Sequence, residues 1–318
     1  MVDKDVIERV KEALLSMQRL SWEQGVAAQA FFEIGDVEMG ILMAKEAVHR
    51  QLADGRLGIA SEPDKSTDPG ANGGPVLQAY NITGDKSFKV AADKMIDWFL
   101  KKAPRTKEGI LYHYVSRPRV LIDSIYHTAP FLALAGYDDE AIKQIKGYRK
   151  LMWNPQKKLY SHIWDDDAKD FGRRAFWGGG NGWAAAAIVR VIKALPEKRT
   201  REKLFLAEYL KEGIDGCLAY QREDGLFHDI IDDPSTFVET TAALMICYSI
   251  YRGIEGGWLP RKYLKHANRI REVTYKMVNE FGIVQGACGA PYFNRRGTSA
   301  ESQAFFLLVE AAYRDSKS

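Results

Sequence analysis

Apolar residues recur at helical spacing along almost the whole chain, and alternation with a period of two is confined to short pieces. Near the N-terminus, for example, Val6, Val10, Leu14 and Met17 fall on one face of a helix. The longer segments follow a common layout: an apolar helix, a turn, a second helix with charges on one face, and an exit that contains glycine. The pattern therefore predicts an all-α protein built from helix pairs.

Six such pairs can be traced, and their first helices begin about 50 to 60 residues apart, a spacing typical of stacked supersecondary units. The first five pairs are 25–32 with 39–52, 75–80 with 88–102, a helix from 129 with 141–152, 183–195 with 204–221, and 240–251 with 263–281. The sixth pairs 302–313 with the N-terminal helix 5–17. The two ends of the chain would thereby close a ring.

The two helices of each pair differ in composition. The first is rich in alanine, glycine and aromatic residues, whereas the second carries lysine and glutamate on one face. A helix that is apolar all round is buried, so the first helices should form an inner layer and the second helices an outer layer. We expect an (α/α)6 barrel, a six-hairpin toroid, over residues 1–318 as a single domain. The alternative, an open solenoid, would need polar capping ends, and neither terminal helix is polar enough.

Composition narrows the class of protein further. The chain has 318 residues, of which 46 % are hydrophobic and 27 % charged, as in ordinary globular proteins. A net charge of +3 is too small to favour nucleic acid or a membrane surface as a partner. Neither a signal peptide nor a membrane-spanning run is apparent, so we expect a cytoplasmic protein. Cys217, Cys247 and Cys288 are scattered, and we expect buried thiols rather than disulfides or a metal site.

The loops that lead into the inner helices carry many polar and aromatic residues, and in a toroid they would open on one mouth. Loops of this length in a compact domain are usually functional. Acids, aromatic rings and basic groups over one cavity suit a sugar, because arginine and histidine bind carboxylates and rings stack on pyranose faces. The candidate residues are Asp68, Asn72, Asp123, His162, Arg174, Trp177, Asn181, Trp183 and Glu239.

Each candidate also has a purely structural interpretation. The acids that precede helices can be N-caps, namely Asp68, Asp123, Glu239 and Glu301. Trp177 and Trp183 can be core aromatics, and His162 can be a structural histidine. The glycine run between the two tryptophans favours a functional loop, because such a run is costly in a structural element and lets backbone approach a ligand.

Asp123 has the most distinctive setting, since it is the only carboxylate in the apolar stretch 120–133. Removing a charged carboxylate from water is costly, so an acid in such a place tends to keep its proton. A carboxylic acid that is protonated near neutral pH can donate a proton to a substrate. Asp123 is therefore the candidate general acid.

Four segments carry a family resemblance when they are taken together. They read LIDSIY at 121–126 followed by PFLA at 130–133, YSHIWD at 160–165, WGGGNGW at 177–183 and TSAESQAF at 298–305. This combination resembles the unsaturated rhamnogalacturonyl hydrolases of glycoside hydrolase family 105, which are related to the unsaturated glucuronyl hydrolases of family 88. The resemblance extends from Trp22 to the end of the chain, and the family fold is an (α/α)6 barrel.

The resemblance implies roles for several residues and a reaction. Asp123 matches the general acid/base, Asp68 the second active-site acid with Asn72 as a rival, and His162 and Trp177 match substrate-binding residues. The family removes a terminal 4,5-unsaturated uronic acid from lyase-generated oligosaccharides, here of the pectin or rhamnogalacturonan type. It does so by hydration of the C4=C5 double bond, and no cofactor or metal is needed.

One position departs from the family pattern. The family often reads Trp-Gly-Arg-Gly where this chain has Gly179, and that arginine contacts the uronate. The uronate carboxylate would then need another partner. The candidates are Arg173, Arg174, Arg117 and Arg119, and we favour Arg174 because it lies closest in sequence to Trp177.

Three other functions remain open from the sequence. An inverting glycosidase acting on a saturated substrate would use Asp123 with Glu239 or Asp68 as its acid and base. A sugar epimerase on a similar barrel would use a histidine pair such as His162 and His228. A binding module would need no chemistry, but the loop rich in glycine and tryptophan argues against it.

Overall fold

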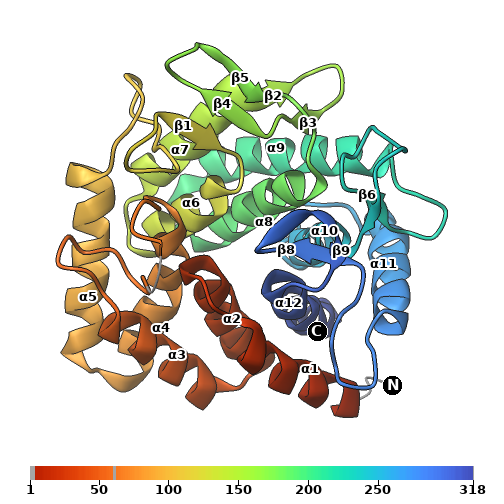
Figure 1. The fold of residues 1–318 in the computed structure, drawn as a ribbon, viewed down its shortest axis with the longest axis horizontal. Coiled ribbons are helices and arrows are strands. Elements are labelled where there is room, and N and C mark those ends of the chain that lie inside the picture. The colour runs from red at the N-terminus through yellow and green to blue at the C-terminus, as the bar shows by residue number, and fades with distance from the viewer. Residues whose placement is uncertain (1–3, 60–61, 318) are drawn as a thin grey trace.

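A computed structural model of the chain describes residues 4–59 and 62–317. Within these ranges the protein contains two concentric layers of helices (Figure 1). The inner helices are α2 (Ser21–Ile34), α4 (Gly73–Thr83), α6 (Ser124–Leu134), α8 (Gly178–Ala194), α10 (Thr240–Glu255) and α12 (Ala300–Asp315). The outer helices are α1 (Lys4–Met17), α3 (Val37–His49), α5 (Lys86–Asp97), α7 (Asp138–Met152), α9 (Thr200–Leu218) and α11 (Leu264–Lys276).

The two layers differ in burial as the composition predicted. In α12, every side chain from Ala300 to Ala312 is buried. The outer helix α9 buries one apolar stripe, Leu206, Leu210, Ile214 and Cys217, at the spacing of one helix face, together with the neighbouring Gly216. Inner helices therefore lie between the outer layer and the barrel axis, and each outer helix covers them with its apolar face.

The inner helices form a closed ring. Each packs against the next along the chain, and α12 packs against α2 and against α1. The sixth helix pair is thus made from the two ends of the chain. The predicted (α/α)6 barrel is confirmed, and the open solenoid is wrong.

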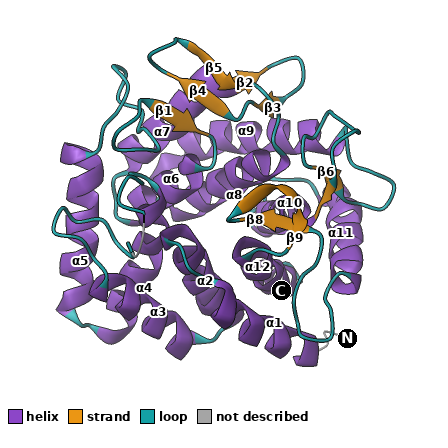
Figure 2. Cartoon of the chain, in the orientation of Figure 1, coloured by secondary structure: helices purple, strands orange, loops and turns teal. Residues whose placement is uncertain are grey.

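Short strands lie at one mouth of the barrel (Figure 2). Each lies in a connection between an outer helix and the following inner helix. The strands are β1 (Arg119–Leu121), β2 (Trp153–Asn154), β3 (Leu159–Tyr160), β4 (Ile163–Asp165), β5 (Asp170–Arg173), β6 (Phe227–His228), β7 (Val238–Glu239), β8 (Ala287–Gly289) and β9 (Tyr292–Gly297). They pair antiparallel as β1-β4-β5, β2-β3, β6-β7 and β8-β9. This mouth is also where the inner helices begin.

Short helical turns complete the described chain. They are η1 (Asp68–Asn72), η3 (Glu197–Arg199) and η4 (Arg261–Tyr263), which are 3₁₀ turns, and η2 (Trp98–Lys102), a π turn that continues α5. The three cysteines are free and buried, as expected. In the described part of the chain, no helix has the length and apolar character needed to cross a bilayer. The cytoplasmic location stays a prediction.

Candidate active site

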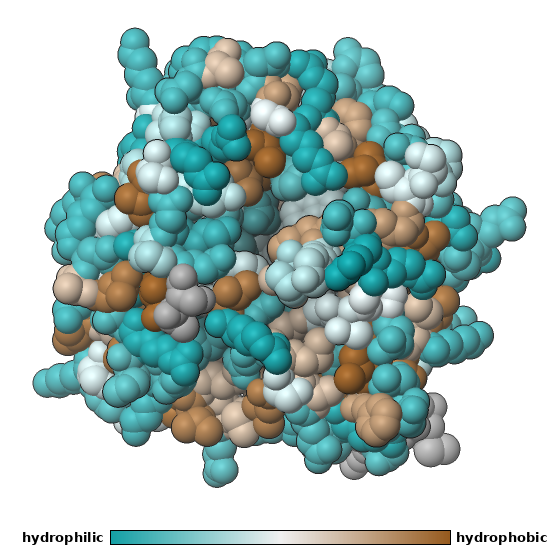
Figure 3. Space-filling model, in the orientation of Figure 1, coloured by the Kyte–Doolittle hydropathy of each residue, from teal (hydrophilic) through white to brown (hydrophobic). Residues whose placement is uncertain are grey.

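A cavity of about 240 Å³ opens at the mouth where the inner helices begin. Figure 3 shows this face of the molecule hollowed near its centre. Helix N-termini carry partial positive charge, so their convergence here favours an anionic ligand. The lining residues are Trp22, Lys65, Asp68, His113, Tyr114, Leu121, Asp123, His127, His162, Ile163, Arg173, Trp177, Trp183, Phe293 and Glu301.

Asp123 lies directly before α6, in the N-cap position, yet its side chain makes no capping hydrogen bond. Its Oδ1 atom is buried and has no hydrogen-bond partner in the structure. Burying a polar atom without a partner is costly, and in proteins such atoms often face a ligand. The N-cap alternative does not explain this side chain, whereas an acid that faces a substrate would.

Asp68 is almost fully buried, and its environment is basic. Its Oδ1 accepts a hydrogen bond from His127 Nδ1 at 3.1 Å, and its Oδ2 lies 3.3 Å from Lys65 Nζ. Burial works to raise the pKa of Asp68, but His113, Lys65 and His127 together hold that pKa well below its usual range. Asp68 is therefore ionised at neutral pH.

His113 connects this network to α6. Lys65 Nζ lies 2.8 Å from His113 Nε2, and the ammonium group must be the donor. The other ring nitrogen, Nδ1, then carries the proton and donates to Ser124 Oγ at 2.8 Å. Burial lowers the pKa of His113, in agreement with this neutral tautomer. Lys65 therefore supplies the full positive charge beside Asp68, and the N–H side of the neutral His113 ring, with Nδ1 3.5 Å from Asp68 Oδ1, adds to it.

Asp68, Asp123 and His127 offer side-chain atoms that all lie within 4.8 Å of one another. Spacing alone would permit a metal ion. The charge of Asp68 is already balanced, because Lys65 Nζ lies 3.3 Å from its Oδ2 and would repel a second cation. The donor set fits proton chemistry between two carboxylates better than it fits metal binding.

His162 and Trp177 form the wall beside Asp123. Their ring centroids are 4.7 Å apart with an angle of 31° between the planes. Burial lowers the pKa of His162 to about 4. The neutral ring therefore accepts a hydrogen bond at Nδ1 from Arg173 Nη1, which is 2.8 Å away. Arg173 stands at the exposed rim with its guanidinium directed to the cavity wall.

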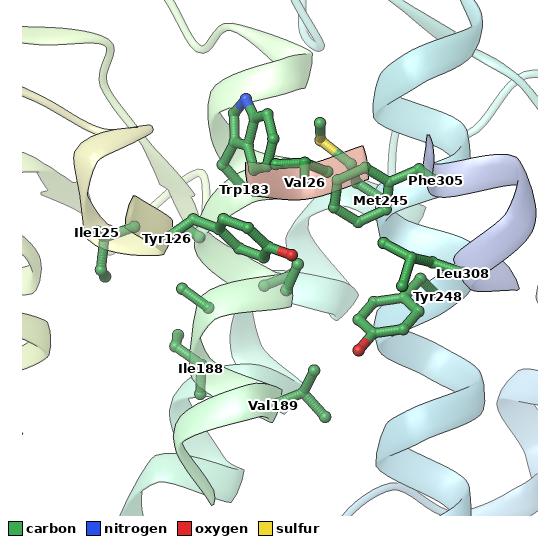
Figure 4. Packing of buried hydrophobic residues seen from close by; sticks show 14 of the residues in the cluster. Val26, Ile125, Tyr126, Trp183, Ile188, Val189, Met245, Tyr248, Phe305 and Leu308 are labelled. Atoms are coloured by element: carbon green, nitrogen blue, oxygen red, sulfur yellow. The ribbon is translucent and has the colours of Figure 1, made fainter. Parts of the chain in front are cut away.

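Trp183 forms the floor of the cavity. Its ring packs against Tyr126 at 4.7 Å, Phe305 at 5.3 Å and His127 at 5.4 Å between centroids. Figure 4 shows Trp183 above Tyr126 and Phe305, at the top of the aromatic core. Trp183 is thus both a core residue and a cavity residue, so the two interpretations of it were not exclusive.

Comparisons with known proteins agree with this geometry. The family model described as Glycosyl Hydrolase Family 88 matches residues 2–309. The chain belongs to this family. It is a glycoside hydrolase, as the motif resemblance predicted.

Individual relatives support the assignment. The chain is 29 % identical over 280 residues to "Unsaturated rhamnogalacturonyl hydrolase YesR" of Bacillus subtilis (strain 168), a match that covers 82 % of this chain and 78 % of the relative. Two solved structures share the fold. A possible family 105 member from Salmonella enterica serovar Paratyphi A has a TM-score of 0.86 at 19 % identity, over 98 % of this chain and 93 % of the other. A family 105 glycoside hydrolase from C. acetobutylicum has a TM-score of 0.84 at 16 % identity, over 99 % of both chains.

The glycine run 177–183 is not a loop in this hydrolase, which corrects the expectation from its sequence. Helix α8 begins at Gly178, and its glycines are buried within the first turns. A Cβ atom at Gly180 would lie 2.4 Å from Ile122 Cγ2, and one at Gly182 would lie 2.7 Å from Met245 Cβ. These glycines allow α8 to pack closely against the segment before α6 and against α10, and none of them is among the lining residues of the cavity.

Gly179 also has a packing explanation. A Cβ atom there would lie 2.7 Å from Cζ2 of Trp177, so the indole ring covers the position where the family often has arginine. A longer side chain at Gly179 would push Trp177 away from His162. The missing arginine is therefore linked to the inward position of Trp177.

The structure does not bring four of the predicted residues to the cavity. The amide of Asn181 binds the backbone of Tyr160 and Trp177, and the amide of Asn72 donates to Ser21 O. Glu239 caps α10 by accepting from Thr241 N and Ala242 N. Arg174 is exposed and pairs with Asp170, so the preference for Arg174 over Arg173 is not supported.

Sequence reasoning missed several lining residues. Lys65 and His127 were not among the candidates, and Glu301, which belongs to the motif at 298–305, was given no role of its own besides a possible N-cap. In the structure Ser299, not Glu301, caps α12. A signal existed for His127 alone, since it follows Asp123 by four residues and so shares its helix face.

Proposed function

We propose that this hydrolase removes a terminal 4,5-unsaturated uronic acid from lyase-generated oligosaccharides of the pectin or rhamnogalacturonan type. The name of the Bacillus subtilis relative supports this substrate class. The cavity supports it chemically, because its lining combines three acids, Asp68, Asp123 and Glu301, with basic side chains and aromatic rings. A terminal sugar, rather than the middle of a long chain, fits a cavity of about 240 Å³.

In the proposed reaction, Asp123 donates its proton to C4 of the double bond, and positive charge develops at C5 and the ring oxygen. Ionised Asp68, with oxygen atoms within 4.8 Å of Asp123, stabilises that charge. Water then adds at C5 while the Asp123 carboxylate takes a proton from it. The resulting hemiketal opens and expels the aglycone. No step of this proposed reaction transfers electrons or needs a group carrier, so we propose that no cofactor takes part.

Arg173 is the proposed partner of the uronate carboxylate. It lines the cavity, and its Nη1 is bonded to His162, which leaves its other nitrogen atoms able to bind an anion. A guanidinium group binds a carboxylate in a bidentate manner that lysine cannot reproduce. The helix N-termini at the same mouth add a favourable field for the negative charge.

The two rival enzymes fit this site less well. An inverting glycosidase holds its carboxyl groups roughly 6.5–9.5 Å apart to admit a water, but Asp68 and Asp123 are within 4.8 Å, and Glu239 caps a helix. An epimerase would need His162 and His228 together. His228 does not line the cavity, and it is bonded to Thr236 O and Arg222 instead. We also propose that residues 1–318 form a single domain. The buried hydrophobic residues form one contiguous core, which supports this proposal.

The observation that carries the proposal is the partner-free oxygen of Asp123 beside an ionised Asp68. Asp123→Asn keeps the shape but cannot cycle a proton, so turnover should fall by about 10²- to 10⁴-fold. The assay follows loss of the absorbance of the conjugated double bond in unsaturated uronosyl disaccharides. Asp167→Asn, at an exposed aspartate, is the control and should retain full activity. An Asp123→Asn enzyme with a third of the wild-type rate would refute the assignment.

A further inference from the structure

Glu301 is an acid in the cavity that the proposed reaction does not use. It lies in the first turn of α12 and is 4 % exposed. Its Oε1 accepts a hydrogen bond from Trp22 Nε1 at 2.6 Å. Its Oε2 is buried and has no hydrogen-bond partner. Two other lining residues have such an atom, Asp123 at Oδ1 and His127 at Nε2, so three polar atoms without a partner belong to residues that line one cavity.

The surroundings of Glu301 define what kind of group it can bind. No basic side chain forms an ion pair with it among the described residues, and Lys65 is already paired with Asp68. Burial raises the pKa of Glu301, and the nearby Glu23 has a pKa raised to about 7 by burial and by the charge of Glu301. An acid in this setting disfavours a second anion. A hydroxyl group, which both donates and accepts, satisfies Oε2 in either protonation state.

The position of Glu301 in the barrel determines which part of the sugar it meets. The inner helices follow one another around the ring, so α12 lies across the mouth from α6, and α2 lies across from α8. Glu301 and Trp22 therefore face Asp123 and Arg173 from the opposite wall. In a pyranose ring, C2 lies opposite C5, which carries the carboxylate, and C3 is the neighbour of C2 opposite the ring oxygen. With the carboxylate at Arg173 and C4 at Asp123, ring hydroxyl groups face Glu301.

We propose that Glu301 is a specificity-determining residue whose free carboxyl oxygen binds a ring hydroxyl group of the unsaturated uronic acid. The inference rests on the proposed function and adds to it a contact between the enzyme and a hydroxyl group of the sugar. Gly289 in β8 leaves room beside this oxygen, since a Cβ atom there would lie 3.1 Å from Oε2. Trp22 acts as a positioning residue, because its indole N–H fixes the other carboxyl oxygen.

The test combines enzyme variants with substrate analogues. The substrates are the phenyl glycoside of the unsaturated uronic acid and its 2-deoxy and 3-deoxy analogues. The enzymes are the wild type, Glu301→Ala, Glu301→Met, which keeps the length of the side chain, and Glu301→Gln. Glu223→Ala, at an exposed glutamate, is the matched control. Thermal melting verifies that each variant is folded.

Loss of one hydrogen bond predicts that Glu301→Ala and Glu301→Met lower kcat/KM for the parent glycoside about tenfold. For one of the two deoxy analogues they should match the wild type within about threefold, because the contact is already gone. Glu301→Gln should stay close to the wild type. Equal losses on all three substrates, or no loss on any, would overturn the inference while leaving the proposed function intact. If the wild-type enzyme does not hydrolyse the parent glycoside, both the proposed function and the inference about Glu301 are contradicted.

Discussion

Lowering the pH from 7 to 5 should destabilise this protein through His162. Burial lowers the pKa of His162 from 6.5 to about 4, whereas in the unfolded chain the ring regains its ordinary pKa. Between these two values the unfolded state binds a proton that the folded state does not. The free energy of unfolding therefore falls as the pH drops from about 6.5 toward 4.

The size of the effect follows from the shift. At about 1.36 kcal/mol for each pKa unit, the limit is roughly 3 kcal/mol. The side chain is only partly buried, and the transition is incomplete at pH 5, so about 1–2 kcal/mol is the expected loss. Protonation also removes the acceptor of the hydrogen bond from Arg173. The KM for an unsaturated uronide should therefore rise over the same pH range.

Urea unfolding at pH 7, 6 and 5, followed by tryptophan fluorescence, measures the loss. His162→Asn places an amide oxygen near the Nδ1 position and does not titrate, so its stability should fall less than that of the wild type. His49→Asn, at an exposed histidine of α3, should behave as the wild type does. If the His162→Asn and wild-type curves remain parallel between pH 7 and 5, the assigned pKa shift is refuted.

Two further predictions concern the wall around Trp177. Arg173→Lys should raise the KM for unsaturated uronides about tenfold or more, because a bidentate contact is lost, while Arg174→Lys should change the KM little. Steady-state kinetics on both variants measures the difference. A larger effect at Arg174 would show that Arg174, and not Arg173, binds the carboxylate. Gly179→Ala places a Cβ atom 2.7 Å from the Trp177 ring, so it should lower the melting temperature and raise KM; unchanged values of both would show that the ring can shift freely.

The helix pairs were predictable because burial on one side or on all sides leaves a direct trace in the sequence. The apolar run of α10 and the striped pattern of α9 gave the two layers. The strands of two to six residues left no comparable trace, since period-two alternation needs a longer run to be recognised. The glycine run of α8 was misread as a loop, because glycine disfavours helices unless tertiary packing requires it.

The lining of the candidate site was predictable where a residue type has few structural uses. A tryptophan or an acid in an apolar stretch pointed correctly to the cavity at Trp177 and Asp123. Acids and amides before a helix were ambiguous, because capping and substrate binding use the same residue types at the same place. Glu239 turned out to cap α10, and Glu301, with the same local pattern, lines the cavity. Only the neighbours across the barrel distinguish the two.

The glycines of α8 also determine where Asp123, the proposed general acid, lies. Ile122 packs closely against Gly180: a Cβ atom at Gly180 would lie only 2.4 Å from Cγ2 of Ile122. Ile122 directly precedes Asp123 in the sequence. On the other side, Gly182 admits Met245 of α10. The backbone of α8 therefore sets how far Asp123 stands from the wall that holds Trp177 and His162. A side chain at Gly180 would push Ile122, and Asp123 with it, away from that wall, so the glycine motif influences the width of the cavity through packing.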